Sequence, residues 1–158
     1  MEQVAYKVIV DERDPALPAV QDLFTRMHHE MASQGMGLSL AEGGAGLWCA
    51  SVSRGLERFN RLVIAMHGER VVGFAHGAVK LAPEHLGGMR LGHISHVHVA
   101  VDARGKGIGR GMVDLLHAWF ADREVASIEL HVLAGNDAGQ AFWRSLGYRV
   151  ELHQLRKG

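Results

Sequence analysis

Several features that would direct the chain to a special environment are scarce or missing. Cys49 is the only cysteine, which excludes an internal disulfide and fits a reducing, cytoplasmic compartment. No apolar run approaches the roughly 20 residues of a membrane span, and the first residues lack the basic-then-apolar order of a secretory signal. Lysine and arginine (17 together) balance aspartate and glutamate (17 together), so no overall charge draws the protein to nucleic acid or to an anionic membrane. The sequence therefore predicts a soluble protein with neither partner.

What is present is the composition of one folded domain. With 158 residues, 47% of them hydrophobic, the chain is long enough for one core and too short for two ordinary domains. We therefore expect a single domain over residues 1–158. Only three prolines occur, which argues against a disordered or collagen-like chain. Histidine is unusually frequent, at 11 residues, which indicates a pH-sensitive protein without indicating a function.

Short apolar segments and amphipathic segments follow one another in an order that predicts a layered α/β fold. Two apolar segments around the polar turn at 67–70 predict a hairpin. Apolar residues at helical spacing predict helices, the first of them with Asp14 as its N-cap and Pro15 in its first turn. Strands are expected at 6–10, 62–66, 71–80, 93–101, 127–133 and 148–155, a loop at 81–92, and helices at 20–31, 47–59, 108–120 and 136–146.

The strand expected at 93–101 has an irregular alternation. At period two, the valines of its second half share one face, whereas Ile94 falls on the opposite face. One extra residue near Ser95 or His96 restores the register, so the sequence predicts a β-bulge at that point.

A glycine-rich turn follows this strand, in the segment VAVDARGKGIGRG at 99–111. Its four glycines leave backbone amides unobstructed at the positive end of the next helix, which is an arrangement that binds phosphate. Arg104, Lys106 and Arg110 add three cations. The spacing fits neither a dinucleotide-binding fingerprint, which needs glycine at position 110 or 112, nor a Walker A loop, which needs glycine at position 100.

Arg104, Gly107 and Gly109 do fit the pattern (R/Q)xxGx(G/A). Three further segments accompany this pattern in family order: the hairpin IAMHGERVVGFA, the strand VHVAV and the downstream segment LHVLAGNDAGQAFWRSLGY. From 62 to 148 the sequence therefore resembles the GNAT superfamily of acyl-CoA N-acyltransferases. The resemblance implies an α/β fold with a mixed, mostly antiparallel sheet, flanking helices and a splayed, bulged central strand. It also implies acetyl-CoA as the acyl donor.

The resemblance further implies that the pantetheine arm of coenzyme A lies in the gap beside the splayed strand. Asn136 matches a family asparagine that holds the cofactor, although Asn136 or Asp137 also fits the cap of the following helix. The expected contacts are main-chain groups of Val97, His98 and Val99, the pyrophosphate-binding turn of Arg104, Gly105, Lys106, Gly107, Ile108, Gly109 and Arg110, and Asn136 and Trp143 near the thioester.

The implied reaction is direct transfer of an acetyl group to a primary amine of a small molecule or a peptide. The amine must lose a proton, and His131, at a strand position where many relatives have Glu, is the expected general base. His96, close to the bulge, is the second candidate. Trp143 stands where relatives commonly have a tyrosine acid, and because indole is no acid, the proton source for the thiolate stays open. A noncatalytic acyl-CoA sensor is the alternative function.

Two further expectations concern the sheet edge and a group of histidines. Only 11 residues follow Gly147, enough for one strand, and they leave an open edge that a second copy of the chain would cover. We therefore expect a homodimer.

On a regular strand His96 and His98 share a face that His93 does not, so three ligands do not converge and no metal site is expected.

Overall fold

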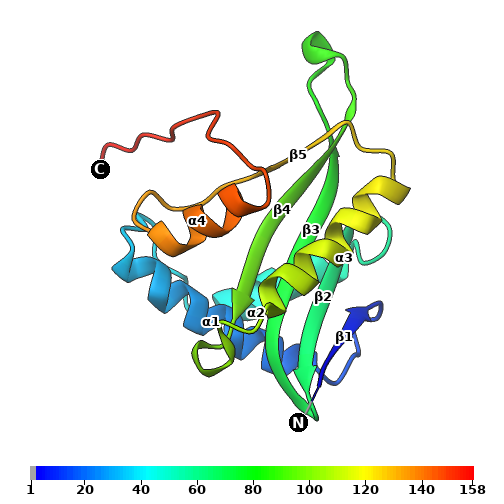
Figure 1. The fold of residues 1–158 in the computed structure, drawn as a ribbon, viewed down its shortest axis with the longest axis vertical. Helices are drawn as coiled ribbons and strands as arrows, with labels where there is room; N and C mark the ends of the chain where they lie inside the picture. Colours follow the sequence, from blue (N-terminus) through cyan, green and yellow to red (C-terminus); the bar gives the residue numbers. More distant parts are fainter. Residues whose placement is uncertain (1–2) are drawn as a thin grey trace.

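An apolar hairpin forms the centre of the sheet in the computed structural model, which describes residues 3–158 (Figure 1). Strands β2 (Asn60–His67) and β3 (Arg70–Leu81) pair antiparallel across a tight turn. Gly68 takes a φ of 61° in that turn, a conformation that glycine adopts without steric cost. The predicted hairpin is confirmed, and both strands are longer than expected.

Three more strands complete a sheet in the order β1-β2-β3-β4-β5. They are β1 (Val4–Ile9), β4 (Arg90–Val99) and β5 (Ser127–Leu130). All neighbouring pairs are antiparallel except β4 and β5, which run parallel. The expected mixed, mostly antiparallel sheet is therefore confirmed.

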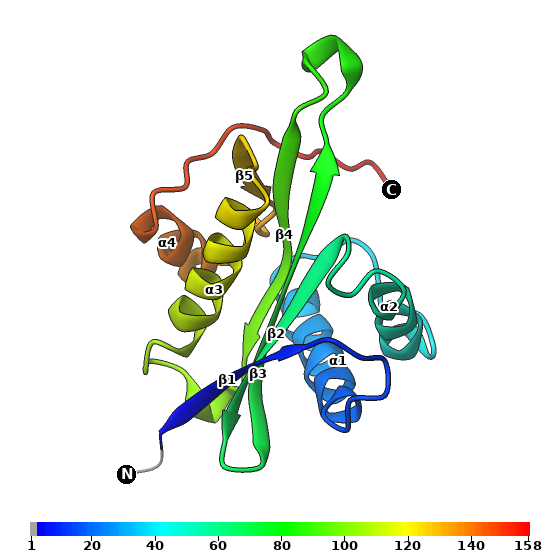
Figure 2. The same ribbon diagram turned by 90° about the vertical axis from the view of Figure 1, so that its right-hand side faces the viewer.

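Helices cover both faces of this sheet (Figure 2). One face carries α1 (Leu17–Ser33) and α2 (Gly44–Ser53), and the other carries α3 (Ile108–Asp122) and α4 (Asp137–Ser145). No helix within residues 3–158 is long and apolar enough to cross a membrane.

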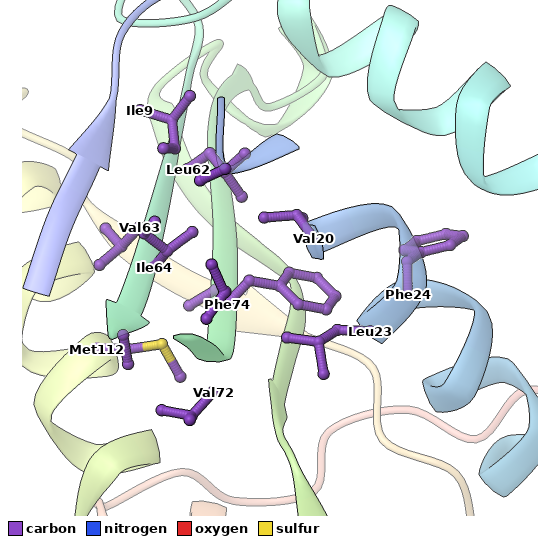
Figure 3. Packing of buried hydrophobic residues seen from close by; sticks show 14 of the residues in the cluster. Ile9, Val20, Leu23, Phe24, Leu62, Val63, Ile64, Val72, Phe74 and Met112 are labelled. Carbon is purple, nitrogen blue, oxygen red and sulfur yellow. The ribbon is translucent and has the colours of Figure 1, made fainter. Parts of the chain in front are cut away.

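The core lies between the sheet and the first and third helices (Figure 3). Val20 and Leu23 of α1 pack toward Phe74, which is completely buried on the α1 face of β3. Burial of such a side chain stabilises the fold by about 1.5–3 kcal/mol. On the opposite face, Met112 of α3 packs so tightly on Gly73 that a Cβ there would lie 3.0 Å from the methionine methyl group.

The last predicted strand is wrong. Residues 148–155 form no strand, and from residue 149 onward every residue of the segment is exposed. Val150 and Leu152 alternate as in a strand, but a strand also needs a neighbour to satisfy its main-chain groups. The chain instead leaves α4 as an extended segment that ends away from the sheet (Figure 1).

Several predicted boundaries also need correction. Helix α1 begins at Leu17, because Asp14 accepts a hydrogen bond from the amide of Ala16 (2.9 Å) in a turn that precedes the helix. Helix α2 spans Gly44–Ser53 rather than 47–59, since the chain then turns around the carbonyl of Gly55. Strand β5 stops at Leu130 instead of continuing to 133.

The loop predicted at 81–92 is shorter in the structure, where it covers 82–89. Strand β3 extends to Leu81 and β4 starts at Arg90, with a short 3-10 turn at Glu84–Leu86 between them. The resulting hairpin projects well beyond the rest of the molecule (Figure 1).

Candidate functional site

Strand β4 has its irregularity where the sequence predicts it. Opposite β3, His96 pairs with His76 and Ile94 pairs with Gly77, so Ser95 is the extra residue of a β-bulge. The predicted bulge is confirmed at Ser95.

The bulge brings the histidines of β4 onto one face of the sheet. Residues paired across antiparallel strands share a face, and His93, His96 and His98 pair with Ala78, His76 and Phe74 respectively, which alternate along the α1 face of β3. The prediction that His93 lies on the other face is therefore wrong, because it assumed a regular strand. Within residues 3–158, no group of three histidine, cysteine or acidic side chains is arranged to hold a metal ion.

Strands β4 and β5 separate immediately after the bulge begins. Their parallel pairing ends at Ile94 and Leu130, and β4 continues to Val99 without a backbone partner on that side within the described residues. We call the two diverging segments, 95–99 and 131–133, the fork; they move apart toward α3 and α4 (Figure 1). The splayed, bulged strand implied by the family resemblance is present.

Main-chain groups of β4 point into the fork at alternate residues. The amide of Ala100 donates to the carbonyl of Val72 on β3 (2.8 Å). By alternation, the main chain of His98 also faces β3, whereas the main-chain groups of Val97 and Val99 face the fork. Of the three expected pantetheine contacts, two thus have main-chain groups on the open side, and His98 does not.

The glycine-rich turn lies at the open end of the fork, before α3. Gly105 and Gly107 take φ values of 80° and 79°, and a Cβ on either would meet nothing within 4 Å. The amides of residues 105–110 have no acceptor among the described residues, and they lie at the positive end of the α3 dipole. Ile108 is buried in the core, while Lys106 and Arg110 are exposed without an ion-pair partner in the described part of the chain.

Arg104 has a different role from the other two cations of this turn. Its Nε donates to the carbonyl of Val99 (2.9 Å), and a terminal nitrogen donates to both carboxylate oxygens of Glu30 on α1 (2.8 and 2.9 Å). The guanidinium therefore links the end of β4 to α1, and it leaves Lys106 and Arg110 as the cations open to a ligand.

The far side of the fork is formed by the start and the face of α4. Asn136 caps this helix, since its Oδ1 accepts from the amide of Gly139 (2.9 Å). The ring of Trp143 packs against Tyr148, with the ring centres 5.2 Å apart. The hydroxyl of Tyr148 lies 2.8 Å from Nε2 of His117 on α3, and burial raises the pKa of this tyrosine to about 12. Tyr148 is thus a protonated packing residue that joins α4 to α3.

The two base candidates lie at the apex of the fork. His131 is exposed directly after β5, on the same face as Glu129 and its partner His93, and its ring centre lies 5.6 Å from that of His93. His96 is more enclosed, with ring centres of Phe24 and Trp48 at 5.2 and 5.5 Å. Both histidines face the α1 side of the sheet.

Burial keeps the inner histidines uncharged at neutral pH. It lowers the pKa of His76 to about 4, that of His96 to about 3 and that of His98 to about 4, because a buried imidazolium loses its hydration. Nearby histidines act in the same direction on His76 and His96. These three rings are consequently desolvated and neutral, and each has one nitrogen that can accept a proton.

Sequence reasoning missed two residues of the apex. His76 of β3 approaches Ser95 through its Nδ1, and His96 approaches the same hydroxyl at 3.0 Å. Ser95 was predicted only as a location for the bulge. The one available signal for His76 was a polar residue in the middle of the apolar segment 71–79, at period two from Phe74.

These features agree with the comparison against protein families. A family model described as Acetyltransferase (GNAT) family matches residues 19–148. The chain belongs to the GNAT acetyltransferase family.

Solved structures of similar fold cover nearly the whole chain. A mutant of the BH1408 protein from Bacillus halodurans has a TM-score of 0.81 at 17% identity, covering 98% of this chain and 99% of its own. A protein described as a transcriptional regulator from Bacillus halodurans C-125 has a TM-score of 0.77 at 17% identity, with 99% of each chain covered. An aminoglycoside N-acetyltransferase in complex with CoA has a TM-score of 0.75 at 13% identity, covering 99% of this chain and 97% of its own. No curated protein matches, and identities this low establish the fold alone.

Proposed function

We propose that this protein is a cytoplasmic N-acetyltransferase that moves an acetyl group from acetyl-CoA to a primary amine of a small molecule or peptide. The observation that carries the proposal is the row of amides at 105–110 without protein acceptors, beside two exposed cations and the open fork. A diphosphate satisfies those amides, and an extended amide-containing arm bonds to the free main-chain groups of Val97 and to the amide of Val99, whose carbonyl already accepts from Arg104. In this proposal Asn136 contributes through its Nδ2, since its Oδ1 caps α4.

The same proposal assigns the chemistry to the apex of the fork. The amine nitrogen attacks the thioester carbon, the carbon–sulfur bond breaks, and the amine proton passes to a histidine, either His96 or His131. The coenzyme A sulfur leaves as a thiolate and takes a proton from solvent. In this proposal Trp143 lines the gap that holds the pantetheine arm. It does not act as an acid, because its indole N–H does not titrate in water.

The direct test is release of coenzyme A thiol from acetyl-CoA in the presence of an amine panel. The panel contains an aminoglycoside, a small alkylamine and a peptide with a free N-terminus. We expect amine-dependent thiol release with at least one class, together with a rise in the melting temperature on addition of millimolar acetyl-CoA. If the protein shows no acetyl-CoA binding and no thiol release with any amine of the panel, the proposal is contradicted.

The departure at Trp143 favours a second candidate function, a noncatalytic acyl-CoA sensor. Such a sensor needs the turn and the fork but no proton acceptor and no acid. Thermal stabilisation by acetyl-CoA with no thiol release for any amine would favour this second function.

We further propose that the protein works as a homodimer joined through the β5 edge and the C-terminal segment 149–158. Strand β5 has a neighbour on one side only within the described sheet. The adjacent segments expose large apolar side chains that water solvates poorly. These are Leu81, Leu86 and Met89 on the projecting hairpin and Val150, Leu152 and Leu155 on the C-terminal segment, with Leu155 90% exposed. The alternation of Val150 and Leu152 suits an added strand on the edge of a second copy.

Light scattering tests the dimer. The full chain is expected to have twice its mass of 17.2 kDa, and a chain ending at Arg149 is expected to be monomeric, because it lacks the added strand. The double variant Leu152→Asp, Leu155→Asp should behave like the shortened chain. A monomeric full chain, or a dimer that survives both changes, would overturn this part of the proposal.

A further inference from the structure

The ring of His96 presents its two nitrogens to different surroundings. Nδ1 lies 3.0 Å from Oγ of Ser95, while Nε2 has no hydrogen-bond partner among the described residues and is not one of the buried unpartnered atoms. Phe24 and Trp48 flank the ring edge-on and restrict its rotation. Nε2 is therefore the nitrogen of this ring that solvent or a substrate can reach.

Ser95 joins His96 to a second histidine. Its Oγ also contacts Nδ1 of His76, a side chain that is only 8% exposed, and lies 3.3 Å from the carbonyl oxygen of the same residue. The bulge explains this arrangement, because the extra residue in β4 places a serine side chain between two histidines that pair across the strands.

One assignment of protons satisfies all three contacts of Ser95 together. A serine hydroxyl has one proton to donate and two lone pairs that accept. The hydroxyl donates to the carbonyl of His76, and its lone pairs accept one N–H each from Nδ1 of His76 and Nδ1 of His96. Each ring then carries its proton on Nδ1. Any other arrangement makes the hydroxyl donate to one of the rings and leaves the His76 carbonyl contact unused.

We propose that Ser95, held in place by His76, is a positioning residue that fixes His96 in the Nδ1–H form, with the lone pair of Nε2 as the proton acceptor for the attacking amine. This inference rests on the proposed acetyltransferase function and selects His96 over His131 as the base. The proton leaves the amine nitrogen as its bond to the acetyl carbon forms, resides on Nε2 of His96, and returns to solvent after the thiolate has left.

The desolvated ring suits this role. Burial disfavours a charged imidazole, so the ring of His96 is neutral at pH 7 and the lone pair of its Nε2 carries no proton. A weak base suffices, because the N–H of the amine becomes far more acidic than that of a free alkylammonium once the nitrogen is bonded to the acetyl carbon.

Histidine nitrogen spectra of the full-length protein at pH 7.5 test the proton position without any substrate. The signals of His96 are identified by their loss in His96→Gln. We expect its Nδ1 to be protonated and its Nε2 unprotonated in the native protein, and Ser95→Ala to remove this preference while Ser95→Thr retains it. A native His96 protonated on Nε2, or a tautomer unchanged by Ser95→Ala, would overturn the proposal.

Kinetics with the best amine of the panel test the catalytic part. Ser95→Ala is expected to lower kcat about 10- to 100-fold and to leave the KM for acetyl-CoA unchanged. Ser95→Thr is expected to recover most of the lost kcat. Ser51 is an exposed serine of α2, and Ser51→Ala is expected to have no effect. An unchanged kcat in Ser95→Ala contradicts the proposal. Absence of thiol release by the native protein contradicts the proposed function instead, and the nitrogen spectra still decide the proton position.

Discussion

Replacement of Gly107 by alanine is expected to weaken acetyl-CoA binding at least tenfold. An alanine at φ near 79° costs about 1–2 kcal/mol, and the turn relieves this strain by rotating away from positive φ. Because that rotation turns neighbouring amides away from their common direction, the diphosphate loses main-chain donors. The measurement is the dissociation constant of acetyl-CoA by titration calorimetry.

Gly43 provides a matched control for this variant. It is also the residue that precedes a helix, it has a φ of 67°, and a Cβ on it would meet nothing within 4 Å. Gly43→Ala should therefore lower the melting temperature about as much as Gly107→Ala and leave acetyl-CoA affinity unchanged. Equal affinities in the two variants would show that the turn before α3 does not hold the diphosphate.

Stability is expected to fall steeply as the pH is lowered from 6.5 toward 4. The pKa values of His76, His96 and His98 lie near 4, 3 and 4 in the folded protein, whereas an unfolded histidine titrates near 6.5. Between these values the unfolded chain binds protons that the folded chain does not. The contribution of these histidines to the free energy of unfolding is therefore fully present above pH 6.5 and is lost as the pH decreases. The three histidines together contribute a slope of up to about 4 kcal/mol per pH unit.

Urea unfolding at a series of pH values between 7 and 5 measures this slope. His98→Gln should reduce it by about one third, since one of the three buried titrating groups is removed. Substitution of the exposed His153 by alanine should leave it unchanged. A free energy of unfolding that stays constant between pH 7 and 5 would contradict the burial of these rings.

Local patterns predicted the parts of the molecule that depend on neighbouring residues. The hairpin follows from two apolar segments around a tight turn, and the bulge follows from the parity conflict between Ile94 and the valines after it. The glycine turn was likewise visible in the spacing of its residues. Each of these features is determined within about a dozen residues, so the sequence carries it directly.

The errors occurred where distant residues decide the outcome. The segment 148–155 alternates like a strand, but the pairing that defines a strand depends on a neighbour that the described chain does not provide. The sequence also carries no sign that the guanidinium of Arg104 pairs with Glu30, which lies on α1, 74 residues earlier in the chain. The face of His93 was misjudged because a bulge reverses the alternation on one side of itself.

The arrangement at Ser95 shows why a site can be hidden even when its location is predicted. The bulge was expected there, but His76 reaches the serine only because β3 and β4 pair in one particular register. Nothing in the spacing of the sequence joins residues that lie 19 positions apart on two strands.

The central claim is that the amides of residues 105–110 and the fork side of β4 bind coenzyme A. A titration of ¹⁵N-labelled protein with coenzyme A, followed through amide shifts, tests it most directly. We predict that the largest shifts occur at residues 105–110 and at Val97 and Val99, with little change at Gly43. Shifts confined to other parts of the chain, or none at millimolar coenzyme A, would contradict the account.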